Sequence, residues 1–535
     1  MKKNYISIAL TLSALVLSSS CVDMDTAPMG STITAGQKEL AYQRNPDMVS
    51  AGVSGITAMF SVYGNAISTA TSISHNDIGY PAIMMILDSR GMDFVGFDTG
   101  YNWFRRSLNY SDNLNSSDMT ALIWNTIYNQ LYATRLISSS IDPETEDPKL
   151  QFYLAQALAI RAFDYFTLAQ TYQFTYKGNE DKPCVPVITE LNADESALVG
   201  MARATVKDTY TQIMKDLDKA IALLENSTVK RSDKRYVSRE VAYGIRARVN
   251  LVMQNYSAAA SDAQTAIKDS DAKPSSIKDA SMPTFKDITE SDWMWGMLVA
   301  ETDRVVTSGI VNWPSHMGSL NYGYASVGAW RLINKKLYNS IPATDVRKGW
   351  FLDANGASAN LSFAQQAYVK SAGCPPYTQV KFAPYKNELG TSENANDIPL
   401  LRIEEMYLIL AEAQAMGGNS SEGKKTLEDF VRAYRDPSYV CPAADAAGVQ
   451  DEVWNQRRIE LWGEGQSYFD VMRLKKPIDR RGGGYAAALV FNIQPTDPVL
   501  IYQIPRAEEQ ANPLINEEDY NPTSSTPSPV ADTED

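Results

Sequence analysis

The sequence is poor in the residues that most often build metal centres and catalytic sites. Its 535 residues include two histidines and four cysteines. His75 and His316 stand in neither an HExxH motif nor a triad-like setting, so we expect loop or core residues rather than ligands or bases. The cysteines form no CxxC pair, which argues against a structural zinc site and a disulfide framework. We therefore predict no metal site, no cofactor and no catalytic residues.

Basic residues are also scarce relative to acids. Lysine and arginine number 49 against 63 aspartates and glutamates, which gives a formal net charge of −14. A chain of this charge repels the phosphate backbone of nucleic acids and anionic membrane surfaces. The composition thus excludes nucleic acid as an expected partner.

Long apolar runs are absent, but a short one stands near the N-terminus. Lys2 and Lys3 precede an apolar segment of signal-peptide length, too short to span a bilayer. Ser19 and Ser20 stand directly before Cys21 and resemble a bacterial lipobox, although a strict lipobox has leucine where Ser18 stands. We predict that residues 1–20 are a lipoprotein signal peptide and that Cys21 is lipidated. Ordinary secretion, with Cys21 as an incidental thiol, is the alternative.

Apolar residues at steps of three and four predict a mainly α protein. Such runs cover residues 122–141, 150–172, 206–224, 239–253, 247–267 and 402–435. Ala259 and Ala263 after Tyr256 resemble the tetratricopeptide pattern, in which small residues let paired helices approach closely. We expect tetratricopeptide-like helix pairs that form a scaffold.

Composition divides the chain further. Between about residues 268 and 397, helix signals thin out while Gly, Pro, Ser, Asn, Tyr and Trp become frequent. We predict a loop-rich, ligand-binding insertion with short strands, set in a helical scaffold of about 35–267 and 398–480. The whole forms a single domain over 21–521. The remaining residues, 522–535, are rich in Pro, Ser, Thr and acids and are predicted to be a disordered tail.

Four stretches in order resemble the SusD/RagB family of surface lipoproteins. They are "AQALAIRAFDYFTLAQTYQFTY" with "KPCVPVITE", "RATVKDTYTQIMKDLDKAIALL" with "SREVAYGIRARVNLVMQNYSAAASDA", "IPLLRIEEMYLILAEAQA", and "VWNQRRIELWGEGQSYFDVMRLKKP" ending in "IPRAEEQANPLINEEDYNP". The resemblance extends from Cys21 to about Asn521 and is loosest between residues 268 and 400.

The resemblance implies a function in nutrient capture. It implies a non-catalytic lipoprotein that is anchored at the outer-membrane cell surface, binds glycans and delivers them to a SusC-like TonB-dependent transporter. Oligopeptide binding, as in the RagB branch, is one alternative. A surface glycoside hydrolase is a less favoured one, and a structural protein that only caps the transporter is another.

Aromatic side chains in two polar, loop-rich stretches are the candidate ligand contacts. Aromatic rings stack on the C–H faces of sugars, and polar side chains hydrogen-bond to hydroxyls. The stretches are 76–104 and 291–330. The predicted ligand-binding residues are Arg90, Tyr101, Asn102, Trp103, Trp313, Tyr322 and Tyr324. For each ring, packing in the core is the competing interpretation.

The stretch "RRIELWGEGQSYFDVMR" contains two carboxylates one helical turn apart, Glu460 and Glu464. Paired carboxylates are what a glycosidase needs. Arginines surround them in the sequence, so we interpret the charges as ion pairs that hold helices together rather than as a catalytic pair.

Overall fold

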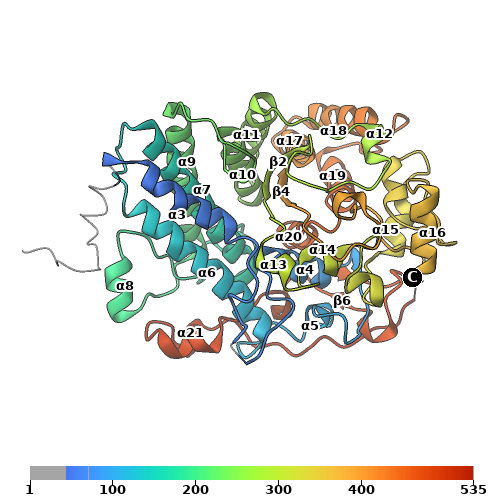
Figure 1. Cartoon of the computed structure of the whole chain (residues 1–535), viewed down its shortest axis with the longest axis horizontal. Helices are drawn as coiled ribbons and strands as arrows, with labels where there is room; N and C mark the ends of the chain where they lie inside the picture. Colours follow the sequence, from blue (N-terminus) through green and yellow to red (C-terminus); the bar gives the residue numbers. More distant parts are fainter. Residues whose placement is uncertain (1–41, 43, 70, 534–535) are drawn as a thin grey trace, which may run out of the picture.

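Long helices dominate the fold (Figure 1). The structure is a computed structural model that describes residues 42, 44–69 and 71–533. The longer helices are α3 (Asp47–Ala58), α4 (Tyr80–Arg90), α6 (Asp118–Ser138), α7 (Pro148–Tyr172), α9 (Val206–Asn226), α10 (Arg239–Val252), α11 (Tyr256–Asp269), α17 (Ile403–Met416), α18 (Ser420–Tyr434) and α19 (Ala446–Glu460). Shorter helices are α5 (Arg105–Leu108), α8 (Ala193–Val199), α12 (Ile277–Ala280), α13 (Arg304–Thr307), α14 (Trp313–Met317), α15 (Lys335–Ser340), α16 (Phe363–Ser371), α20 (Ser467–Arg473) and α21 (Arg506–Ala511). The predicted mainly α class is confirmed.

Side-chain caps fix where several of these helices begin. The Asp147 carboxylate accepts hydrogen bonds from the backbone N–H groups of Lys149 and Leu150, and Pro148 occupies the first helical position of α7. The Thr205 hydroxyl accepts from the N–H of Asp208 at the start of α9. These caps satisfy N–H groups that have no partner inside the helix, which is why the chain turns into helix at these residues.

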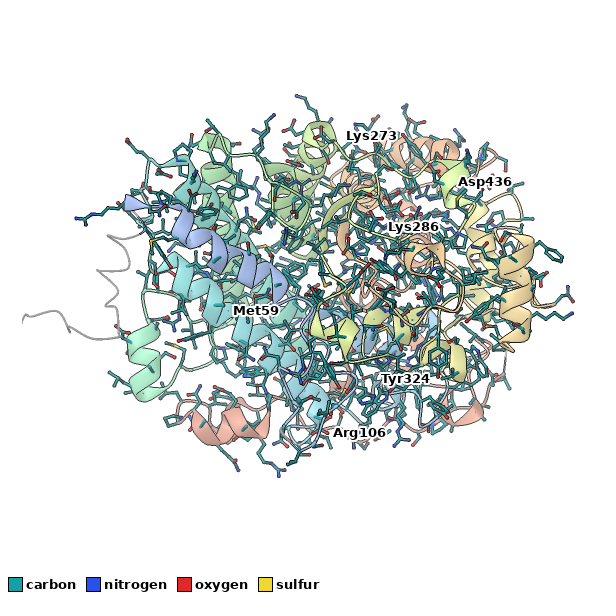
Figure 2. All side chains as sticks on the ribbon, viewed as in Figure 1. Met59, Arg106, Lys273, Lys286, Tyr324 and Asp436 are labelled. Carbon is teal, nitrogen blue, oxygen red and sulfur yellow. The ribbon has the colours of Figure 1, made fainter. Side chains whose placement is uncertain are left out.

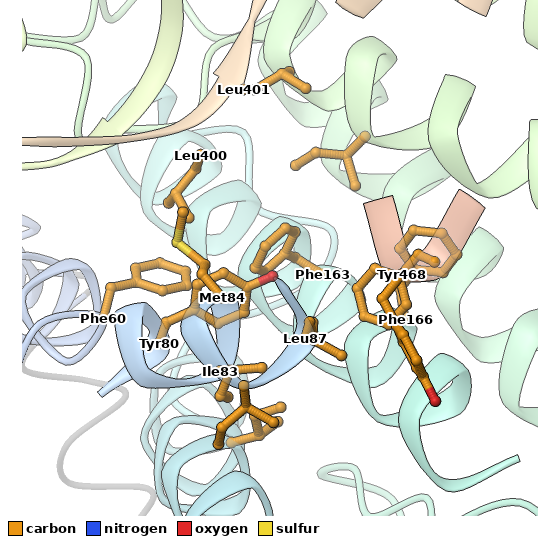
Figure 3. Packing of buried hydrophobic residues seen from close by; sticks show 14 of the residues in the cluster. Phe60, Tyr80, Ile83, Met84, Leu87, Phe163, Phe166, Leu400, Leu401 and Tyr468 are labelled. Atoms are coloured by element: carbon orange, nitrogen blue, oxygen red, sulfur yellow. The ribbon is translucent and has the colours of Figure 1, made fainter. Parts of the chain in front are cut away.

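Helices α4 and α7 form the centre of the main core. Every residue of α4 is buried, and so is α7 from Leu154 onward. Figure 3 shows Phe60, Tyr80 and Phe163 packed together; the Phe60 and Tyr80 ring centroids lie 5.9 Å apart at an edge-to-face angle of 89°. A helix that is buried on all sides needs neighbours all round, and α7 contacts α3, α6, α9 and α10.

The region between α11 and α17 consists of loops, short helices and short strands. Strand β2 (Trp293–Met297) pairs antiparallel with β4 (Ile398–Arg402), which leads directly into α17. Strand β3 (Leu332–Ile333) pairs with β1 (Phe94–Val95), and β5 (Ile478–Asp479) pairs with β6 (Asn492–Ile493). The β1–β3 pairing connects the region to a segment that precedes it in the chain, whereas both strands of the β5–β6 pair lie after it.

Buried ion pairs join the C-terminal helices to this region. The Glu460 carboxylate lies 2.7 Å from Arg435 and 3.2 Å from both Arg347 and Arg402. Burial alone would raise the pKa of Glu460, but the three arginines hold it well below its ordinary value. Glu464 pairs with Lys381 at 2.7 Å and with Arg402 at 2.8 Å. The interpretation of these charges as ion pairs between helices is confirmed.

The C-terminal residues differ from the predicted disordered tail. Residues 522–533 contain no helix or strand and are mostly exposed, but hydrogen bonds link them to the rest of the domain. The N–H of Val530 donates to the carbonyl of Val490 at 2.9 Å, and the Asn113 amide donates to the Ser524 hydroxyl at 3.0 Å. Backbone and side-chain partners outside the tail therefore hold a segment whose composition alone favours disorder. The predicted signal peptide and Cys21 lie outside the described residues.

Candidate functional site

Two distant segments bring three of the predicted rings together, of which Tyr101 is exposed, Trp103 is partly exposed and Tyr324 is buried. Trp103 and Tyr324 have ring centroids 6.4 Å apart. Tyr101, which is 54% exposed, lies beside Gly328, just after the loop that carries Tyr324. Tyr322 is 48% exposed and belongs to the same loop. Within the described part of the chain, its ring stacks on none of the other three. Figure 2 labels Tyr324 in the lower half of that view.

Hydrogen bonds within the loops hold these rings in position. The Asn102 amide donates to the Phe97 carbonyl at 2.9 Å and accepts from the N–H of Phe104 at 3.1 Å, which fixes the turn on which Trp103 stands. In the second loop, the N–H of Tyr324 donates to the Ser315 hydroxyl at 3.1 Å. Gly323 permits this approach, because a Cβ there would lie 2.5 Å from the Cα of Ser315.

Two histidines form the back of the aromatic cluster. The His75 ring stacks on Trp103 at 4.7 Å between centroids, and the His316 ring stacks on Tyr324 at 4.9 Å. The Tyr324 hydroxyl and His75 Nδ1 share a hydrogen bond, and His316 Nε2 lies 2.9 Å from the His75 carbonyl, to which it donates. Burial lowers the pKa of both rings, that of His316 to about 3. Both histidines are therefore neutral at pH 7 and serve as packing partners.

A small polar pocket opens beside Trp103. Its volume is about 280 Å³, and its lining residues come from the loop before α4, the loop around α5, and the start of α6. They are Ser74, Asn76, Gly100, Asn102, Trp103, Arg105, Arg106, Asp118 and Met119. An aromatic wall with amide, hydroxyl and guanidinium groups around it suits a hydroxylated ring. We define this as the Trp103 pocket.

Three predicted contacts have structural roles instead. Arg90 is fully buried in α4, where it pairs with Asp112 and stacks over Tyr110 and Tyr502. Trp313 is 3% exposed and packs edge-to-face on Phe382. As direct ligand contacts these two predictions are wrong. Asn102 lines the Trp103 pocket but is 2% exposed, and its amide is engaged in the turn described above.

Sequence reasoning missed most of the residues that line the pocket and form its back wall. His75, Asn76, Arg105 and Arg106 were not among the predicted contacts. Arg105 and Arg106 follow Trp103 and Phe104 directly in "YNWFRRSL", so their closeness to a predicted ring was a signal in the sequence. No comparable signal existed for His75, because it meets Trp103 only through the folding of a separate loop.

A larger hollow lies between the α6–α7 loop and α9. Its volume is about 1220 Å³, and apolar side chains such as Leu154, Leu158 and Met214 make up much of its wall. None of the seven predicted contacts lines it. The Trp103 pocket is the better candidate, because the partly exposed Trp103 ring and hydrogen-bonding groups meet there.

The glycosidase alternative has no support at its best pair of carboxylates. Glu460 and Glu464 are buried, and each is paired with basic side chains in the interior. A general acid and a nucleophile must both reach the substrate, which this burial prevents.

The fold and the pocket together define a class: a helical scaffold with a surface pocket that combines an aromatic ring with polar groups. Two family models match the chain. One, described as starch-binding and associating with the outer membrane, matches residues 93–251, and the other, the SusD family, matches residues 341–521. The two stretches cover more than half of the sequence, and the chain belongs to the SusD/RagB family. Neither model describes an enzyme family.

Solved structures show the same fold at low sequence identity. A SusD-like carbohydrate-binding protein from Bacteroides vulgatus matches with a TM-score of 0.72 and 20% identity, covering 89% of this chain and 98% of its own. A SusD superfamily protein from Bacteroides thetaiotaomicron gives 0.69 and 21%, with 89% and 99% covered. Surface glycan-binding protein A from Bacteroides thetaiotaomicron, solved with laminarihexaose, gives 0.63 and 17%, with 89% and 99% covered. No curated protein matches the sequence.

Proposed function

We propose that this protein binds an oligo- or polysaccharide in the Trp103 pocket. The observation that carries the proposal is the partly exposed Trp103 ring, stacked on His75 and bordered by polar groups. A ring held from behind loses little conformational freedom when a sugar stacks on its other face, so more of the stacking energy appears as affinity. The laminarihexaose bound to a protein of the same fold supports a glycan as the ligand.

Capture without chemistry is the proposed mechanism. Stacking on Trp103 and hydrogen bonds from the pocket wall hold the glycan, and no bond breaks. Each such contact contributes modestly, so the glycan dissociates readily. Ready release suits delivery to a partner, which we propose to be a SusC-like TonB-dependent transporter.

The proposed location is the outer-membrane cell surface, with a lipid on Cys21 as the anchor. The family description includes association with the outer membrane. No helix in the described part of the chain is long and apolar enough to cross a bilayer. A diacylglycerol anchor provides membrane attachment without such a helix.

Thermal shift with a panel of ligands tests the proposal. The protein truncated before Cys21 is mixed with neutral and charged polysaccharides and with oligopeptides, while new reducing ends are assayed in the same samples. We expect a glycan to raise the melting temperature without new reducing ends. A shift with peptides alone would establish the peptide-binding alternative, new reducing ends would establish a hydrolase, and no shift with any ligand would support the capping protein.

Trp103→Ala and Phe363→Ala form a matched pair for the responding glycan. Phe363 lies on α16, is 94% exposed and is not part of the Trp103 pocket. Only Trp103→Ala should abolish the shift. Loss in both variants, or in neither, would contradict the assignment of the site.

A further inference from the structure

Basic groups gather at the Trp103 pocket although the protein as a whole is acidic. The chain carries a net charge of −14, yet the charged side chains that line the pocket are two arginines and one aspartate. The pocket lining is therefore locally positive on a surface that otherwise repels anions. Figure 2 labels Arg106 near the lower edge of that view.

The two lining arginines have guanidinium groups free for a ligand. Arg105 is exposed and has no carboxylate partner within the described ranges. Arg106 lies 3.7 Å from Asp118, and both side chains of that pair are more than half exposed. An exposed pair at this distance contributes little and separates easily. Both guanidinium groups can therefore turn toward an anion in the pocket.

A third arginine stands behind the pocket wall. Arg331 is fully buried, and its Nη1 and Nη2 atoms have no hydrogen-bond partner among the described residues. Arg331 Nη1 and Asn102 Nδ2 both lie 3.5 Å from the point where a Cβ would stand on Gly96, so the two side chains are neighbours. Burial lowers the pKa of Arg331 to about 9, so it remains mostly charged at pH 7. Its charge adds to the positive potential at the pocket.

Buried arginines elsewhere in the molecule are better satisfied. Arg402 and Arg435 pair with carboxylates, and Arg480 donates to backbone carbonyls. In the described part of the chain, Arg331 is the buried arginine that leaves both Nη atoms unbonded. An uncompensated positive charge is costly to bury, and an anion nearby would offset that cost.

We propose that the Trp103 pocket selects a glycan that carries carboxylate or sulfate groups, with Arg105 and Arg106 binding the anionic group while Trp103 stacks on a sugar ring. This inference rests on the proposed glycan-binding function and specifies its ligand class. A planar guanidinium donates two parallel hydrogen bonds to a carboxylate or sulfate, which an ammonium group cannot match. The acidic remainder of the surface would keep polyanions from binding elsewhere.

Titration with three oligosaccharides of similar length tests this inference. The probes are laminarihexaose, which is neutral, an oligogalacturonate, which carries carboxylates, and a carrageenan oligosaccharide, which carries sulfates. We expect one of the charged probes to bind at least about tenfold more tightly than laminarihexaose, since hydrogen bonds to charged groups are the stronger ones. The preferred probe distinguishes carboxylate from sulfate. The affinity for that probe should fall as salt is added, because free ions screen exposed charges.

Paired variants separate a specific site from general charge effects. Arg105→Gln/Arg106→Gln should lose that preference while still binding any neutral glycan that the wild type binds. Arg105→Lys/Arg106→Lys should recover part of it. Lys207→Gln/Lys278→Gln removes the same charge from exposed positions on α9 and α12 and should change nothing.

The outcomes distinguish this inference from the function on which it rests. Trp103-dependent binding of laminarihexaose that is as tight as that of the charged probes would overturn the inference and leave glycan binding intact. Equal losses of affinity in Arg105→Gln/Arg106→Gln and in Lys207→Gln/Lys278→Gln would also overturn it, because the attraction would then be non-specific. If no glycan bound, charged or neutral, both the inference and the proposed glycan-binding function would be overturned.

Discussion

Arginine has opposite roles in two regions of the molecule, the buried interior around Glu460 and the Trp103 pocket. Around Glu460, Arg347, Arg402 and Arg435 are buried and paired with carboxylates. At the pocket, Arg105 and Arg106 are exposed and weakly paired or unpaired. An arginine whose donors are all used fixes the positions of helices, whereas one with unused donors remains available to a ligand. Pairing therefore distinguishes structural arginines from candidate binding ones.

The largest expected effect comes from removing the shared carboxylate of the interior. Glu460→Gln leaves three buried arginines without their common partner, which should lower the free energy of unfolding by about 3–5 kcal/mol. Urea denaturation followed by circular dichroism measures the loss. A loss below about 1 kcal/mol would show that the network does not hold the helices together.

A buried acid without an arginine partner should behave differently as pH changes. The Asp88 carboxylate accepts from the N–H of Gly465 at 3.1 Å, and burial raises its pKa to about 8. Because the folded-state pKa lies above the unfolded value, the proton stabilises the fold fully below about pH 4, and this contribution is lost as the pH rises to about 8.

Asp88→Asn should remove this pH dependence. Relative to the variant, the wild type should lose up to about 1.4 kcal/mol of stability per pH unit between pH 5 and 8. Denaturation of both proteins at several pH values measures the difference. Parallel stability curves would show that Asp88 is ionised in the folded state.

At the back of the pocket, a smaller effect is expected from one hydroxyl. Tyr324→Phe keeps the ring stacked on His316 but removes the hydrogen bond to His75, whose ring supports Trp103. We expect a loss of about 1 kcal/mol in stability and a few-fold loss in glycan affinity. Isothermal titration beside thermal denaturation measures both. Unchanged affinity would show that Trp103 does not depend on this support.

The smallest effect is expected at an exposed ion pair. Lys425 and Asp429 lie 2.6 Å apart on α18, and both side chains are at least 60% exposed. Lys425→Ala should change the free energy of unfolding by no more than about 0.5 kcal/mol. This variant is the surface counterpart of Glu460→Gln, and a comparable loss in both would remove the distinction between buried and exposed pairs.

Local periodicity was sufficient to predict the scaffold. The runs at 150–172 and 206–224 correspond closely to α7 and α9, and the run at 402–435 divides into α17 and α18 at Gly417 and Gly418. Apolar spacing and helix caps act within a few residues, so they can be read from a single sequence.

The candidate site depended on contacts between distant segments, which composition does not encode. Arg90 was a predicted contact because it lies in a polar, aromatic stretch, but its partners Asp112 and Tyr502 come close to it only in the folded protein. Trp313 was a predicted ligand contact because glycines and polar residues surround it, with core packing as the alternative, and in the structure its ring packs on Phe382. Trp103 and Tyr324 were each predicted as a ligand contact on separate grounds. Only the structure shows that the two rings lie together, supported by His75 and His316.

The most direct test is an isothermal titration of the mature protein and its Trp103→Ala and Glu460→Gln variants with the best-binding glycan from the panel, at a temperature where all three are folded. If the interior holds the scaffold and the pocket binds the ligand, Trp103→Ala will lose most of the affinity, while Glu460→Gln will be less stable but will bind normally. Normal affinity in Trp103→Ala would place the binding site elsewhere on the molecule.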